Sequence, residues 1–194
     1  MILLKNGQMF IAPVRINELV LIPVLVFIFL LIMIYQVRKH RINIAHQAFI
    51  FILFAYIYFL VGVTIFPINI FGNNSKIYLN GFGLAVSQAN LNPLAVGDYG
   101  LIQIVGNLLL FVPLGFIGAL LYKRFNTLLA NTRLCFVTSL MIELIQLMGC
   151  YFYLSDWSFD VVDIILNTLG GLIGFVLFRL LRKLLGEKLL HVQM

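Results

Sequence analysis

Charged residues are scarce in this chain of 194 residues, because Asp, Glu, Lys and Arg together make up only 10% of it. A soluble domain carries about a quarter charged residues. The hydrophobic share is 62% and the mean hydropathy is +1.07. This composition excludes an ordinary soluble protein. It predicts an all-α, polytopic transmembrane bundle, and the short connections predict one membrane domain over residues 1–194.

Cysteines and known catalytic motifs are also few. Cys135 and Cys150 fall on one predicted helix, about 22 Å apart along its axis, so they cannot form a disulfide with each other. The sequence has no Cys or His spacing typical of zinc, no Ser-His-Asp order, no HExxH and no glycine-rich phosphate loop. Basic residues interleaved with surface aromatics are missing, which argues against nucleic-acid binding.

Long apolar runs are what the chain does have. About 20 apolar residues cross the hydrocarbon core, and in lipid such runs form helices because every backbone polar group needs a partner. Five stretches qualify: Leu19 to Gln36, Ala45 to Pro67, Leu101 to Tyr122, Leu134 to Tyr153, and Asp160 to Leu181. The longest connection, residues 68–100, is predicted to lie on the membrane surface or to fold over the helices as a cap.

The basic residues predict the orientation of these spans, since cytoplasmic loops are enriched in Lys and Arg. Ten of them flank one end of the predicted bundle and three flank the other. The first group is Arg38, Lys39, Arg41, Lys123, Arg124, Arg133, Arg179, Arg182, Lys183 and Lys188, and the second is Lys5, Arg15 and Lys76. We therefore expect the N-terminus outside and the C-terminus in the cytoplasm.

A few polar residues fall within the spans, where a charged side chain costs about 2.5 to 3.5 kcal/mol on insertion scales. Helical spacing places Glu143 and Gln146 on one face of the fourth span, and Asp160, Asp163 and Asn167 on one face of the fifth. Asn107 lies on the third. At a rise of 1.5 Å per residue, Asn107, Gln146 and Asn167 all fall about 10 Å below the outer surface. These residues predict a polar, substrate-binding pocket that opens outward.

Structural roles for the same residues are open alternatives. Asp160 could serve only to cap the fifth helix, because acids favour the first turn. Asn107, Gln146 and Asn167 could hydrogen-bond between helices without binding a ligand. We expect no cofactor, although carboxylate and amide oxygens would suit a divalent cation such as Mg²⁺ or Ca²⁺. Gly115, Gly118, Gly170 and Gly174 predict close helix packing around the pocket.

Three motifs, in order, resemble the VanZ-like membrane proteins. They are the segment from Asn107 through Phe111 and Pro113 to Gly115, the segment Glu143-Leu-Ile-Gln146, and the segment from Asp160 to Gly170. Asn90-Leu-Asn-Pro93-Leu94 resembles a short Asn-Leu-x-Pro-Phe segment that the family carries ahead of them. The resemblance covers about Asn90 to Phe178. It departs at Trp157, where family members commonly have Arg.

The resemblance implies a multi-pass protein of the bacterial cell membrane, associated with resistance to the lipoglycopeptide teicoplanin. It implies no particular reaction, so whether the chain is an enzyme stays open. A first hypothesis is binding or modification of a membrane lipid, a lipid-linked cell-wall intermediate or a lipoglycopeptide. A second is an enzyme acting on a lipid phosphate or ester, with Glu143 and Asp163 as candidate catalytic residues. A third is a proton-coupled transporter, for which a homodimer would restore the symmetry that five spans lack.

Overall fold

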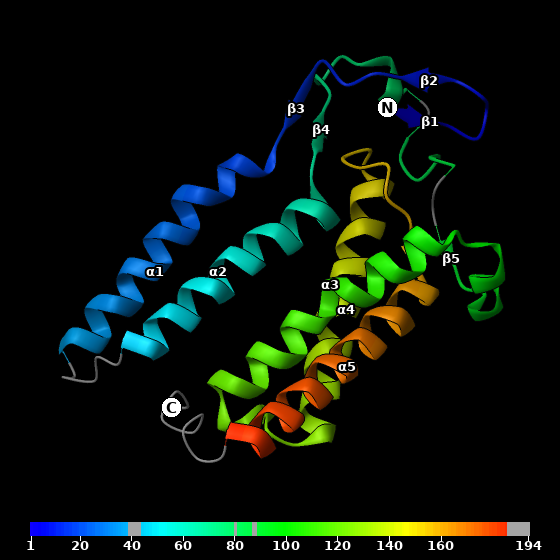
Figure 1. The fold of residues 1–194 in the computed structure, drawn as a ribbon. Helices are drawn as coiled ribbons and strands as arrows, with labels where there is room; N and C mark the ends of the chain where they lie inside the picture. Colours follow the sequence, from blue (N-terminus) through cyan, green and yellow to red (C-terminus); the bar gives the residue numbers. More distant parts are fainter. Residues whose placement is uncertain (39–43, 80, 87–88, 186–194) are drawn as a thin grey trace.

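A computed structural model describes residues 1–38, 44–79, 81–86 and 89–185 of the chain. Its described part contains five helices long and apolar enough to cross a membrane, which confirms the predicted fold class (Figure 1). They are α1 Leu21–Arg38, α2 Ile44–Ile65, α3 Leu101–Leu121, α4 Leu128–Tyr151 and α5 Val161–Leu185. Lys39, Arg41 and Lys188 lie outside the described residues, and the orientation in the membrane stays a prediction.

The start of α4 corrects the predicted boundary. The helix begins at Leu128, six residues before the predicted Leu134, so Arg133 lies inside α4 and not in the preceding loop. The Thr127 side chain caps the helix by accepting a hydrogen bond from the N–H of Ala130, at 3.3 Å. Asn131, Thr132 and Arg133 lowered the local hydropathy ahead of Leu134, and the Thr127 cap sets where the helix begins.

The centre of the bundle is the contact between α3 and α5, whose backbones touch over most of their length (Figure 1). A Cβ added to Gly115, Gly170 or Gly174 would lie 2.0 Å from a backbone carbonyl oxygen of the opposite helix. The predicted role of these glycines in close packing is therefore confirmed. Gly118 serves a different pair, because its nearest neighbour is the Leu134 side chain of α4.

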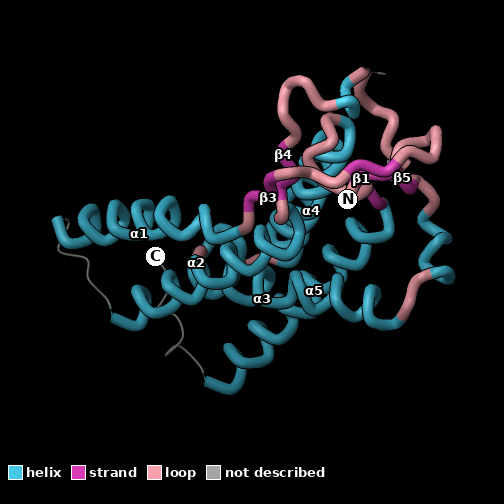
Figure 2. Tube along the Cα trace, turned by 90° about the horizontal axis from the view of Figure 1, so that it is seen from above, coloured by secondary structure: helices cyan, strands magenta, loops and turns pink. Residues whose placement is uncertain are grey.

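Helix α1 lies at the edge of the molecule and packs on α2, away from α3 and α5 (Figures 1 and 2). Gln36 is its one buried residue, and most of its apolar side chains are exposed. In a membrane protein this surface contacts lipid. Helix α2 connects α1 to the other helices, because the Tyr56 hydroxyl of α2 donates a hydrogen bond to the backbone oxygen of Leu110 in α3, at 2.9 Å.

A cap of loops and short strands covers one end of α3, α4 and α5 (Figures 1 and 2). Antiparallel pairs join β1 Ile2–Leu3 to β2 Met9–Phe10 and β3 Val14–Ile16 to β4 Ile68–Ile70. The parallel pair joins β5 Ala89–Asn90 to β6 Phe159–Asp160, directly before α5.

The cap has a small hydrophobic core of its own, which includes Ile2, Leu4, Phe71, Ile77 and Tyr153. The connection between residues 68 and 100 therefore folds over the helices, which was one of the two predicted arrangements. It does so together with the N-terminal strands, which the sequence did not reveal.

Candidate functional site

A cavity of about 320 Å³ lies between α2, α3, α4, α5 and the α4–α5 connection. All six of the predicted site residues line it, so the structure brings together side chains from three helices. The lining residues are Val63, Thr64, Gln103, Asn107, Leu110, Ile142, Glu143, Gln146, Asp156, Trp157, Ser158, Asp160, Asp163 and Asn167. This arrangement shows where the six residues meet. Their role in binding stays a prediction.

Glu143 is the most deeply placed of the acidic residues that line the cavity, with only 2% of its surface exposed. It projects from α4 near the start of α5. One of its carboxyl oxygens, Oε2, accepts a hydrogen bond of 2.7 Å from the backbone N–H of Asp160. Glu143 therefore fixes the strand that precedes α5, and the same side chain lines the cavity.

Asp160 lies in strand β6, one residue before α5 begins, and its carboxylate accepts hydrogen bonds from three partners. Its Oδ1 accepts from the N–H of Val162 at 2.8 Å, so the predicted capping role is confirmed. The amide of Asn90 donates to the carboxylate at 3.3 Å, and the hydroxyl of Tyr99 donates to Oδ2. Asp160 thus caps the helix and also joins it to the loop before α3.

Tyr99 remains a hydrogen-bond donor over a wide pH range. Burial, followed by the hydrogen bond to Asp160, raises the pKa of its phenol from 10.0 to about 12. The hydroxyl is therefore protonated at neutral pH and can donate to the Asp160 carboxylate. Asn90 donates to the same hydroxyl at 3.0 Å, so the two loop residues support each other.

Asp163 lies in the first turn of α5 and pairs with side chains of α3. Asn107 donates a hydrogen bond to its Oδ1, and Gln103 also hydrogen-bonds to this carboxyl group. Gln103 precedes Asn107 by four residues and so lies on the same face of α3. These contacts hold the N-terminal ends of α3 and α5 together at the edge of the cavity.

The two remaining predicted residues form hydrogen bonds between helices, as the structural alternative expects. Gln146 of α4 donates to the backbone oxygen of Thr64 in α2 at 2.8 Å. Asn167 of α5 donates to Ser139 of α4 at 2.9 Å, but its Oδ1 has no hydrogen-bond partner. Asn167 is only 3% exposed, so this acceptor is buried without a partner in a residue that lines the cavity.

Several residues of the site were missed by sequence reasoning. Gln103 could have been found from its spacing to Asn107, but Gln is common on helices and gave no separate signal. Asn90 belongs to the family-like segment, but nothing in the sequence links it to Asp160. Trp157 departs from the family pattern. It lines the cavity with 45% of its surface exposed.

Metal binding has no direct support from the geometry. Among the residues that the structure describes, no group of three or more His, Cys, Asp or Glu side chains is placed to hold a metal ion. The Asp160 oxygens already accept hydrogen bonds from neighbouring groups. A divalent cation at this site stays a prediction from the sequence.

The three polar motifs thus converge on one cavity in the order and spacing that the VanZ-like resemblance implies. A family model described as VanZ/LLP1 matches residues 49–182, more than half of the chain. The chain belongs to the VanZ/LLP1 family. This match starts in α2, upstream of the stretch from Asn90 to Phe178 in which the motifs occur. With five helices able to cross a bilayer, the VanZ/LLP1 chain is a multi-pass membrane protein of bacteria.

Among curated proteins, this VanZ/LLP1 chain is similar to Protein VanZ of Enterococcus faecium. The two are 29% identical over 111 residues, which is 57% of this chain and 64% of that protein. The chain therefore covers less than two thirds of that relative's length. No solved structure matches the chain.

Proposed function

We propose that the cavity binds or modifies a lipid-linked ligand of the cell envelope and that the protein thereby contributes to teicoplanin resistance. The observation that carries this proposal is the convergence of Asn107, Glu143, Gln146, Asp160, Asp163 and Asn167 on one cavity. Interhelical hydrogen bonding alone would be provided by neutral residues at lower cost. Acidic side chains in this environment are typical of functional sites in membrane proteins.

Membership of the VanZ/LLP1 family supports the association with resistance, and the predicted outward opening supports access for ligands of the outer leaflet. Two ligand sources fit that location, a lipid-linked cell-wall intermediate and the lipoglycopeptide itself. The site has apolar walls from Val63, Leu110 and Ile142 beside its acidic ones. Such mixed walls suit a ligand with polar and apolar parts.

The test is the teicoplanin susceptibility of a sensitive bacterial host that expresses the full chain. Glu143→Gln and Asp163→Asn remove an ionisable group but keep an oxygen that can accept the hydrogen bonds from Asp160 and Asn107. We expect both variants to reach the membrane at normal levels and to return susceptibility to that of the empty host. Asp98→Asn, at an exposed acid that does not line the cavity, is the control and should retain full resistance. Full resistance in both cavity variants would exclude the proposal.

A catalytic version of this function rests on Glu143, Asp160 and Asp163 facing one cavity, since acid–base chemistry needs carboxyl groups near the substrate. Comparison of lipid and precursor profiles between expressing and empty cells separates turnover from binding. A new or depleted lipid species, lost again in Glu143→Gln, would support an enzyme. Identical profiles together with resistance would support binding alone.

A further inference from the structure

The cavity has an unbalanced charge. Glu143, Asp156, Asp160 and Asp163 line it, and none of the described lining residues is Lys, Arg or His. Asp156, at the exposed edge, pairs with the N-terminal ammonium of Met1 at 3.5 Å, so the excess of acid lies with the other three. Trp157 adds an aromatic surface. Acidic groups gathered in a poorly solvated space repel one another and any anion, and a bound cation relieves that repulsion. The lining therefore disfavours a bare phosphate head group and favours a positively charged one.

The hydrogen-bond acceptors of the cavity also favour a protonated amine as ligand. Asn167 is 3% exposed and lines the cavity, and its Oδ1 lacks a partner. The carboxyl groups are acceptors as well when ionised. A ligand that enters beside these acceptors gains affinity when it supplies N–H or O–H donors. A protonated primary amine supplies three donors and a positive charge.

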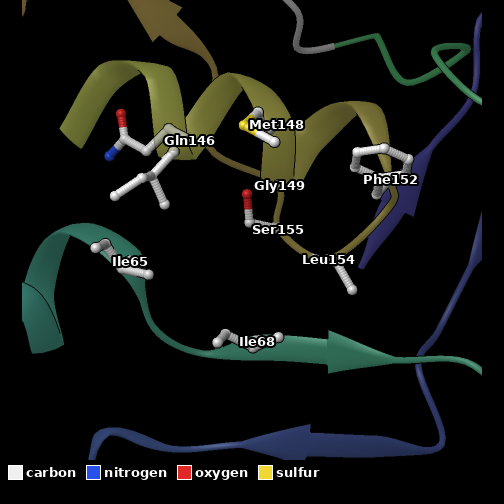
Figure 3. Close-up of a pocket in the computed structure, with 9 residues that line it drawn as sticks. Ile65, Ile68, Gln146, Met148, Gly149, Phe152, Leu154 and Ser155 are labelled. Atoms are coloured by element: carbon white, nitrogen blue, oxygen red, sulfur yellow. The ribbon is translucent and has the colours of Figure 1, made fainter. Parts of the chain in front are cut away.

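An apolar groove of about 290 Å³ adjoins the cavity, and Gln146 lines both. Figure 3 shows Gln146 at one end of the groove and Phe152 toward the other, with Ile65 and Ile68 facing the end of α4 across it. The rest of the lining is also mainly apolar: Ile145, Met148, Gly149, Leu154 and Ser155. Met148 is 60% exposed on a helix that spans the membrane, so hydrocarbon chains of the bilayer can reach the groove from the side.

We infer that the site takes an amphiphile of the membrane whose head is a protonated amine and whose hydrocarbon chain lies in this groove. The inference rests on the proposed function and names the chemical class of its ligand. The amine lies among Glu143, Asp163 and Asn167, where charge and acceptors are complementary to it. The chain passes Gln146 into the groove, where it contacts only apolar walls over most of its length. An amphiphile with the same chain length and an anionic head lacks both the positive charge and the hydrogen-bond donors that favour binding in the cavity.

The chain provides its own reporter for a test, because Trp157 is its one tryptophan and lines the cavity. The full chain, purified in an uncharged detergent, is titrated with dodecylammonium, dodecyl sulfate and dodecanol while Trp157 emission is recorded. We expect a saturable change with the ammonium only. Equal responses to all three compounds would indicate partition into the detergent and would overturn the inference.

Variants locate the two parts of the ligand. Glu143→Gln combined with Asp163→Asn should weaken dodecylammonium binding by about tenfold or more, because the amides cannot ionise beside a bound cation as the two carboxyl groups can. Met148→Gln places an amide in the groove and should weaken binding of the dodecyl chain while leaving a short-chain amine unaffected. Met141→Gln on the same helix, outside groove and cavity, is the matched control. Unchanged affinity in both the double variant and Met148→Gln would overturn the inference.

The outcomes are separable from those of the proposed function. Resistance that depends on Glu143 and Asp163, without ammonium binding, would support the proposed function and reject this ligand class. A parallel titration with dodecyl phosphate, with and without Mg²⁺, covers the anionic alternative. Saturable binding of this phosphate that requires Mg²⁺, without binding of the ammonium, would reject the ligand class in favour of a metal-dependent phosphate site. Ammonium binding without any change in susceptibility would retain the ligand class and reject the role in resistance.

Discussion

At the scale of single residues, the most heavily hydrogen-bonded carboxylate of the site is that of Asp160. It receives a backbone N–H from α5, an amide from Asn90 and a hydroxyl from Tyr99. Glu143 holds the backbone of the same residue. This set of contacts joins α4, α5 and the loop before α3 at one point, so a change in any partner should loosen all three.

Tyr99→Phe tests this joint, because it removes the hydroxyl donor and keeps the ring. We expect a loss of about 1 kcal/mol in the free energy of unfolding, typical of one hydrogen bond that is partly open to solvent. The raised pKa sets the pH window: the contribution is complete below pH 10.0 and is lost as the pH rises through about 12. Thermal unfolding in detergent measures it. Tyr35→Phe, at a tyrosine 65% exposed, is the control and should unfold like the parent.

Sequence reasoning at this scale worked where residues share one helix. A spacing of four residues predicted that Asp163 and Asn167 share a face of one helix, and a spacing of three predicted the same for Glu143 and Gln146. The rise per residue predicted that polar residues of different helices lie at similar depth. It did not find Asn90 and Tyr99, which lie 70 and 61 residues from Asp160 along the chain. Their contacts depend on how a loop without periodicity folds, and no local pattern encodes that path.

At the scale of elements, the packing of α3 against α5 depends on glycines that face backbone atoms. A carbonyl oxygen of the opposite helix cannot move aside as a flexible side chain can, so an added methyl group must separate the two helices. The small residues in the sequence predicted this contact. They did not predict that Gly118 would face α4, because small residues permit close approach without specifying the partner helix.

Gly170→Ala should therefore destabilise the bundle, since its Cβ would lie 2.0 Å from the backbone oxygen of Leu108. Overpacking of this kind costs about 1 to 3 kcal/mol. Gly106→Ala in α3 is the matched control, because nothing lies within 4 Å of its added Cβ. It should be neutral or stabilising by up to about 1 kcal/mol, because Ala favours a helix over Gly. Equal melting temperatures for the parent and Gly170→Ala would contradict the observed helix contact.

At the scale of the whole molecule, the cap and the α3–α4 connection lie at opposite ends of the helices (Figure 1), and Lys5, Arg15 and Lys76 are the basic residues of the cap. The cap covers the end that bears the acidic cavity, whereas Arg38, Lys123, Arg124 and Arg182 belong to the other end, at the end of α1, in the α3–α4 connection and near the end of α5. Hydropathy predicted the helices well because their length is fixed by the bilayer. It could not predict the cap, whose strands are two or three residues long and carry no readable alternation.

The arrangement of charges predicts that the cap, and with it the cavity, faces the outside of the cell. Single cysteines introduced by Asn73→Cys in the cap and by Lys123→Cys in the α3–α4 connection can test this. Both positions are exposed, and the native Cys135 and Cys150 are buried, so the parent chain is a suitable blank. In intact cells, a membrane-impermeant maleimide should label Asn73→Cys alone, and permeabilised cells should label both. Labelling of only Lys123→Cys in intact cells would invert the topology. The cavity would then open to the cytoplasm, where a ligand of the outer leaflet could not enter it.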